Sequence, residues 1–106
     1  MTDITQPAPF FDGILADAGK ERFDTLYERH GVKIERIVSS GTQPVGRYCQ
    51  PADEWILLLQ GHAEMRIGGE LVALRDGDYL HIPARTPHEL VSTSPNALWL
   101  AVHVDG

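Results

Sequence analysis

The sequence has little cysteine and no long apolar runs, and each shortage excludes a class of protein. Among its 106 residues Cys49 is the only cysteine, which excludes an internal disulfide and predicts a reducing, cytoplasmic setting. Apolar runs such as WILLL at 55–59 are far shorter than the ~20 residues that cross a bilayer. The acidic first residues do not have the pattern of a signal peptide. We therefore expect no transmembrane segment.

Positive charge is also scarce. The chain has 9 Lys and Arg against 15 Asp and Glu, a formal net charge of −6, and its basic residues do not cluster. Because such a chain cannot neutralise many phosphates, we expect neither nucleic acid nor a membrane as partner. Small molecules, metal ions and proteins remain. Five histidines beside a single cysteine favour imidazole and oxygen ligands for any metal.

The length and the apolar content of 42% fit a single domain with its own core. We expect residues 1–30 to form an N-terminal arm that packs on a barrel formed by residues 31–106. The paired rings of Phe10 and Phe11 are expected to dock the arm. Apolar residues recur at about one helical turn between Asp17 and His30, which predicts a short helix in an otherwise irregular arm.

The remainder of the chain has the pattern of short β-strands. Segments rich in β-branched and apolar residues alternate with turns that contain Gly, Pro, Asn or Asp. The expected strands are VKIERIVSS, EWILLLQG, AEMRI, ELVAL, YLHIP, HELVSTS and ALWLAVHV. This spacing predicts an all-β fold, either an antiparallel sandwich or a small barrel.

Two segments carry a family resemblance. Glu54 and Gly61 have the E(x)6G spacing that ends the first cupin signature motif, while Gly77, Pro83 and His88 have the spacing of the second. The sequence therefore resembles a small single-domain cupin of the RmlC-like superfamily. The resemblance implies a cupin-type antiparallel β-barrel, also described as a double-stranded β-helix or jelly roll, with a pocket for a small molecule.

The match departs from the usual motifs at several positions. Tyr48 and Gln50 stand where the family has two histidines, Arg85 replaces an inner glycine, and Ser92 replaces the final asparagine. In this respect the chain is similar to a subgroup of small bacterial cupins that lack the paired histidines. Most members of that subgroup have no assigned reaction, so the resemblance does not name a substrate.

The motif positions supply the candidate metal ligands. Residues 48 and 50 share one face of a strand, and the resemblance brings Glu54 and His88 to the same point. We expect Glu54, His88 and Gln50 to bind a divalent transition metal, namely Fe, Mn, Ni or Zn. His103 would add a second imidazole if it points inward, but strand alternation leaves this open because both faces of its strand are apolar. A protein without a metal is the alternative.

Several functions follow from these residues. The first is a metal-dependent enzyme that acts on a small molecule through Glu54 and His88; a metal-free version would use His88 as base and Tyr48 as acid. The second is a binding module without catalysis, in which Arg85 or Arg47 holds a carboxylate group of the ligand. The third is a purely structural barrel with a filled interior.

The sequence also predicts self-association. The WILLL run is apolar at successive positions, so this strand should be covered on both faces. Cupins with a single domain usually pair, and we expect a homodimer that involves this strand and the Phe10–Phe11 arm.

Overall fold

The protein is represented by a computed structural model, and the structure describes residues 6–105. The regular structure of these residues is entirely β-strand, and no helix among them could cross a membrane. The strands are β1 (Glu21–Arg29), β2 (Val32–Ser39), β3 (Gly46–Tyr48), β4 (Asp53–Gln60), β5 (His62–Ile67), β6 (Glu70–Arg75), β7 (Tyr79–Ile82), β8 (His88–Thr93) and β9 (Ala97–Val104).

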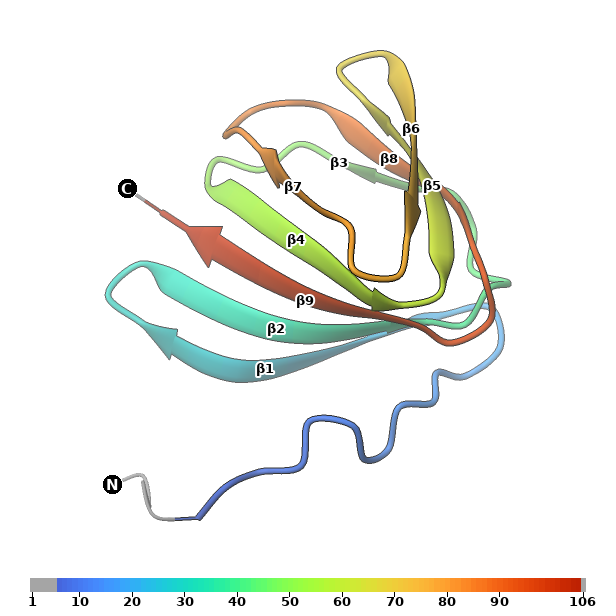
Figure 1. Ribbon diagram of the computed structural model, residues 1–106. Helices are drawn as coiled ribbons and strands as arrows, with labels where there is room; N and C mark the ends of the chain where they lie inside the picture. The colour runs from blue at the N-terminus through green and yellow to red at the C-terminus, as the bar shows by residue number, and fades with distance from the viewer. Residues whose placement is uncertain (1–5, 106) are drawn as a thin grey trace.

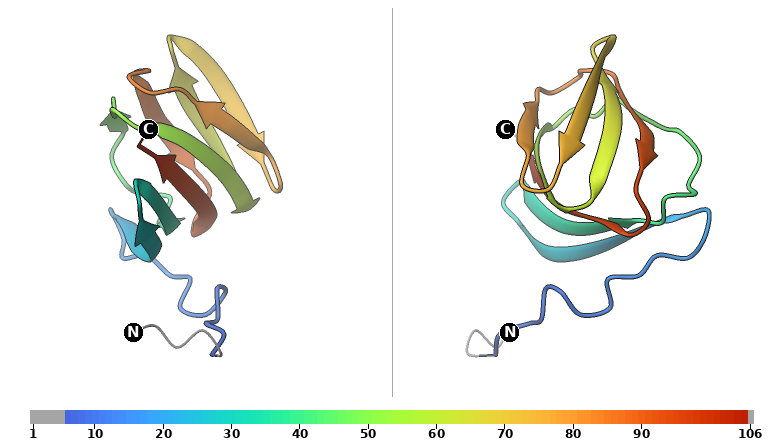
Figure 2. Two further views of the ribbon diagram at one scale, coloured as in Figure 1. Left: turned by 90° about the vertical axis from the view of Figure 1, so that its left-hand side faces the viewer. Right: turned by 45° about the vertical axis from the view of Figure 1, so that its right-hand side comes forward.

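The strands form two antiparallel sheets that face each other (Figures 1 and 2). One sheet has the order β1-β2-β9-β4-β7 and the other has the order β3-β8-β5-β6. Strands distant in sequence therefore lie side by side, as in a jelly roll. This confirms the predicted all-β antiparallel barrel.

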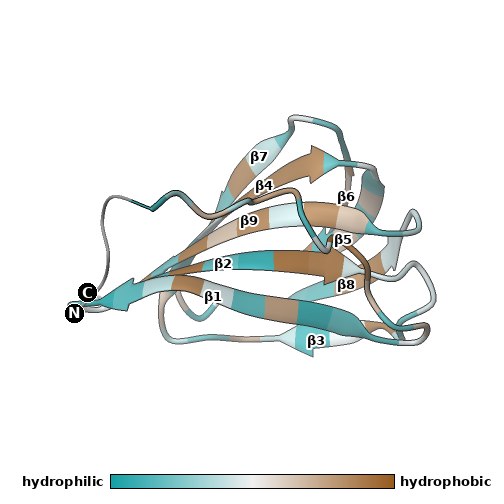
Figure 3. Ribbon diagram, turned by 90° about the horizontal axis from the view of Figure 1, so that it is seen from below, coloured by the Kyte–Doolittle hydropathy of each residue, from teal (hydrophilic) through white to brown (hydrophobic). Residues whose placement is uncertain are grey.

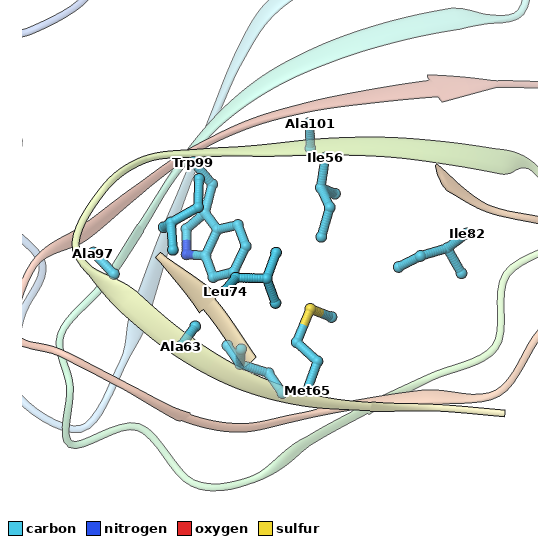
Figure 4. Packing of buried hydrophobic residues seen from close by; sticks show 10 residues of the cluster. Ile56, Ala63, Met65, Leu74, Ile82, Ala97, Trp99 and Ala101 are labelled. Carbon is cyan, nitrogen blue, oxygen red and sulfur yellow. The ribbon is translucent and has the colours of Figure 1, made fainter. Parts of the chain in front are cut away.

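The core lies between the two sheets. On β4 the side chains of Ile56 and Leu58 are 4% and 0% exposed and point inward, whereas the alternating Trp55 and Leu57 are half-buried on the outer face. Figure 4 shows Ile56 among apolar side chains from both sheets, with Met65 of β5 opposite it. The WILLL run therefore fills the core with one face only.

The helix predicted between Asp17 and His30 is wrong, because Glu21–Arg29 is strand β1, paired with β2. A β-bulge between Thr25 and Tyr27 breaks the alternation of this strand. The extra residue spaces the apolar positions about one helical turn apart, which explains the misleading pattern. The expected boundary at residue 30 divides a single hairpin, and the irregular segment comprises only the described residues 6–20.

This irregular segment, the arm, crosses the outer face of the five-stranded sheet (Figures 1 and 3). The buried guanidinium group of Arg36 donates hydrogen bonds to the carbonyl oxygens of Phe10 at 2.6 Å and Asp12 at 2.9 Å, and lies 5.9 Å from the Phe10 ring. Phe11 is 57% exposed, so one of the two rings takes part in docking. The part of the predicted arm before residue 6 lies outside the described residues.

Candidate functional site

The candidate site is a cavity of about 80 Å³ inside the barrel. Side chains from both sheets converge on it. The polar lining residues are Glu21, Glu35, Tyr48, Gln50, Glu54, His88 and His103. The apolar lining residues are Phe23, Ile37, Ile56, Met65, Ile82, Leu90 and Trp99.

Glu54 lies at the centre of the polar lining. It is 8% exposed, and each of its carboxylate oxygens faces one imidazole. Oε1 is 3.5 Å from Nε2 of His88, and Oε2 is 3.8 Å from Nε2 of His103. Both separations exceed an ordinary hydrogen bond, so the carboxylate lies between the two rings without binding tightly to either.

His88, at the start of β8, is 5% exposed and has a fixed ring orientation. Its Nδ1 lies 2.9 Å from the carbonyl oxygen of Thr86. Because a carbonyl only accepts, Nδ1 carries a hydrogen and Nε2 faces Glu54. The Glu54 carboxylate raises the pKa of His88 above its ordinary value; burial opposes this shift, and the Thr86 carbonyl supports it. The Glu54 carboxylate therefore stabilises the protonated ring relative to a free imidazole.

His103 points into the cavity, which resolves the alternative that the sequence left open. It is opposite Glu54 in the β4–β9 pairing and is held by a carboxylate on β2. Nε2 lies 2.9 Å from Oε1 of Glu35, and the other oxygen of Glu35 is 3.5 Å from Nζ of Lys33. The cavity thus contains two imidazoles and the carboxylates of Glu35 and Glu54.

Tyr48 and Gln50 line the cavity at the positions where the usual motif has histidines. The Tyr48 hydroxyl donates to Oε1 of Glu21 at 3.1 Å, and its ring stacks on His88 with centroids 5.6 Å apart. Burial raises the pKa of Tyr48 to about 12, and the adjacent Glu21 carboxylate adds to this effect. Tyr48 is therefore a neutral hydrogen-bond donor near pH 7.

The two predicted arginines lie outside the cavity lining. The Arg47 side chain is 78% exposed on the opposite side of β3 from Tyr48, where its Nε is 3.4 Å from Glu89. Arg85 is exposed in the loop before β8, with a φ of 62° in the left-handed region at the position where the family has glycine. The structure therefore brings neither guanidinium group to the cavity.

Glu21 and Glu35 line the cavity, but the sequence interpretation missed both. Each is a charged residue in a polar stretch, which resembles a solvent-exposed strand. The available signal was strand alternation, because residues two apart point to the same face. Glu35 therefore shares a face with the apolar Ile37, and Glu21 with the apolar Phe23. Only the pairing with β9 shows that this is the inner face.

Comparison with protein families identifies this architecture. The family profile described as "Cupin domain" matches residues 35–103, which include Glu54, His88 and His103. The chain belongs to the cupin family. No curated protein matches the sequence.

Several solved structures resemble this cupin over most of its length. A protein from Ralstonia eutropha JMP134, provisionally described as a mannose-6-phosphate isomerase, is 36% identical with a TM-score of 0.84, covering 95% of this chain and 99% of that one. A cupin superfamily protein from Desulfitobacterium hafniense DCB-2 is 19% identical with a TM-score of 0.74, covering 95% and 92%. An RmlC-like cupin from Shewanella frigidimarina NCIMB 400 is 13% identical with a TM-score of 0.70, covering 87% and 82%.

Cupins commonly bind metals, which makes the arrangement of donors in this cupin informative. Within residues 6–105, no three His, Cys, Asp or Glu side chains are gathered as a ready set of metal ligands. The side-chain nitrogen and oxygen atoms of the same residues that are fully shielded from solvent all have hydrogen-bond partners. Glu35, for example, already accepts a hydrogen bond from Nε2 of His103. In this arrangement polar lining residues bind one another, as Tyr48 binds Glu21 and His103 binds Glu35.

Proposed function

We propose that this cupin is a small-molecule enzyme whose reactive centre is Glu54 with His88 and His103, and that a divalent transition metal binds at this centre. The observation that carries the proposal is the position of Glu54, whose two carboxylate oxygens each face the Nε2 atom of a histidine. Two imidazoles and one carboxylate form a recurrent ligand set for first-row transition metals, including Fe, Mn, Ni and Zn.

The chemistry of the donors fits a metal. The hydrogen bond from Nδ1 of His88 to Thr86 leaves the Nε2 lone pair directed at Glu54 when the ring is neutral. His103 can contribute its own Nε2 after it separates from Glu35. Gln50, also in the lining, offers a weaker amide oxygen. A bound metal would polarise a carbonyl group or activate water or dioxygen.

Other residues of the cavity have supporting roles in this proposal. Glu35 orients the imidazole of His103, and the neutral Tyr48 phenol can donate a hydrogen bond to a substrate oxygen. The apolar side chains on the remaining wall, which include Met65 and Trp99, limit the number of water molecules beside the reacting groups.

The size and charge of the cavity define the class of substrate. About 80 Å³ is well below the ~300 Å³ at which pockets for drug-sized ligands begin, so the buried part of the substrate is small. The described lining contains three glutamates and neither Lys nor Arg. A phosphate group would be repelled there, so we do not extend the mannose-6-phosphate description of the Ralstonia protein to this cupin. We propose a small substrate without phosphate.

The test is metal binding by untagged protein. Elemental analysis should find a transition metal, and calorimetric titration of metal-stripped protein with Zn²⁺, Mn²⁺, Ni²⁺ or anaerobic Fe²⁺ should give one site. His88→Ala, His103→Ala and Glu54→Gln should each weaken binding by at least about 100-fold, since each removes a ligand and loss of a supporting residue alone costs 10–100-fold. His62→Ala, at an exposed histidine on another strand, is the matched control.

A second candidate is a cupin that binds a small ligand without a metal or catalysis. The 2.9 Å contact between His103 and Glu35 favours it, because this contact already occupies one proposed ligand. Wild-type protein that contains no metal and gives no heat with any of the four ions would exclude the metalloenzyme and leave this candidate. If His62→Ala weakened metal binding as much as the substitutions of Glu54, His88 and His103, this result would also argue against the proposed ligands.

A further inference from the structure

The cavity reaches a place where the barrel is not closed by backbone hydrogen bonds. Strands β1 and β3 are edge strands of different sheets, and neither pairs with the other. In the view of Figure 3, β3 is seen beyond the β1 edge of the five-stranded sheet. We call this junction the β1–β3 seam. Phe23 of β1 lines the cavity and is nevertheless 51% exposed, so solvent reaches the cavity wall at the seam.

A side-chain hydrogen bond crosses the seam. The Tyr48 hydroxyl donates to Oε1 of Glu21 at 3.1 Å, which connects β3 to β1. Glu21 is fixed on its own side, because its Oε2 accepts a hydrogen bond of 2.8 Å from Ser39. Tyr48 is held less firmly, since β3 has three residues and residues 49–52 after it form no strand. Tyr48 is therefore the partner that can move.

Gly46 provides the space that the Tyr48 ring occupies. These residues are two apart on β3 and so share a face, and the ring folds back over the glycine. A Cβ atom on Gly46 would lie 2.7 Å from the Tyr48 hydroxyl oxygen and 2.8 Å from a ring carbon. No side chain fits there while the ring is in this position. The backbone of Gly46 does not have a positive φ, so alanine is compatible with its conformation.

We infer that small molecules reach the cavity through the β1–β3 seam, and that Tyr48 is a gate held closed by its hydrogen bond to Glu21. In the closed position the ring covers His88, which is 5% exposed behind it. Movement of the ring away from Gly46 breaks the bond to Glu21 and uncovers the imidazole. The inference concerns access to the cavity and holds whether or not the cavity binds a metal.

Trp99 provides a direct measurement of access. The chain has two tryptophans, and Trp99 lines the cavity while being 3% exposed. In a Trp55→Phe background, fluorescence reports on Trp99 alone. Acrylamide, a small neutral quencher, should quench it weakly when the gate is closed. Tyr48→Phe removes the hydrogen bond, and Gly46→Ala displaces the ring while keeping the hydroxyl group. Each should raise the quenching constant severalfold.

The matched control is Tyr79→Phe, which removes a hydroxyl from a tyrosine that is 68% exposed on β7 and should leave quenching unchanged. Circular dichroism and urea titration establish that each variant is folded under the conditions of the quenching experiment. If Tyr48→Phe or Gly46→Ala is folded and its quenching constant equals that of the Trp55→Phe protein, the proposed gate is wrong. If Tyr79→Phe raised the quenching constant by the same factor, the gate would also be wrong, because the effect would not be specific to the seam.

Discussion

Ser39 has no exposed surface, yet its hydroxyl group connects two side chains of the cavity wall. It accepts a hydrogen bond of 3.1 Å from Nε1 of Trp99 and donates one of 2.8 Å to Glu21. Without this hydroxyl the buried indole N–H would lack a partner, and the Glu21 carboxylate would keep only its hydrogen bond from Tyr48. A single small residue thus positions both the cavity wall and the acceptor of the Tyr48 bond.

We predict that Ser39→Ala lowers the free energy of unfolding by about 1–3 kcal/mol, the usual cost of leaving buried polar groups unpaired. Urea denaturation followed by tryptophan fluorescence measures the change. Ser92→Ala is the control, because Ser92 is exposed and contacts Glu64 at the surface. Equal stability of the Ser39 variant and wild type would indicate that water replaces the hydroxyl without cost.

The site could be predicted from sequence in part. Motif spacing placed Glu54 and His88 in the cavity, because turn and strand lengths fix where those positions fall. Alternation could not place His103, since both faces of β9 are apolar. The inward direction of Glu21 and Glu35 depends on how β1 and β2 pair with β9, and pairing between distant strands leaves no local sequence signal.

At the scale of elements, the β1–β2 hairpin is joined to the arm by Arg36. The guanidinium group that binds the arm carbonyls also donates two hydrogen bonds to Oδ2 of Asp24 on β1, at 2.9 and 3.1 Å. Burial acts to raise the pKa of Asp24, but the hydrogen bonds from Arg36 and Arg22 outweigh it and lower the pKa below 3.8. The ionised carboxylate therefore stabilises the folded state.

The sign of the pH dependence follows from the lowered pKa. The contribution of Asp24 is present above the pKa of the unfolded chain and is lost as the pH falls through the lower pKa of the folded state. We predict that Asp24→Asn reduces the free energy of unfolding at pH 7 by about 1.5–3 kcal/mol. The difference from wild type should shrink once the pH is below the folded-state pKa. Urea unfolding at pH 7 and at low pH measures both values.

The control for this prediction is Asp17→Asn, at an exposed aspartate in the arm. Its effect should be small at both pH values, because surface substitutions away from such contacts change stability little. A difference between Asp24→Asn and wild type that persisted at low pH would show that packing, and not charge, explains the loss.

The sequence predicted most elements correctly from their β-branched residues and their turns. It failed at β1 because an inserted residue mimics the helical period there. It also overestimated the docking of the arm through aromatic rings. The arm is anchored by its backbone carbonyls to a buried arginine, and sequence cannot show where a carbonyl group points.

On the scale of the whole molecule, the outer face of the five-stranded sheet is only partly covered. On this face Val38 and Leu98 are fully buried, while Trp55, Leu57 and Val102 are only half-buried. Figure 3 shows apolar segments along β2, β9 and β4 on this side of the protein. Because contiguous apolar surface favours association, we propose that two copies pair through this face.

We predict a dimeric mass by light scattering at micromolar concentration, and a monomeric mass for Leu57→Glu, because a charge at the centre of the paired surface would be buried without a partner. Leu71→Glu is the control, since Leu71 is 54% exposed on β6 of the other sheet. A monomeric wild-type protein would remove the proposal. A dimer that persisted in the Leu57 variant would locate the interface elsewhere.

The β1–β3 seam also bears on how this barrel could diversify. Gly46 and Tyr48 lie on a short edge strand that pairs only with β8, whereas Glu54 and His103 belong to the opposite sheet. Substitutions at positions 46 and 48 would therefore act on the seam without touching Glu54 or His103, and among the proposed reacting groups they adjoin only His88, which stacks on Tyr48. Selection for a new substrate size and selection for a new reaction would act on different strands of the same small domain.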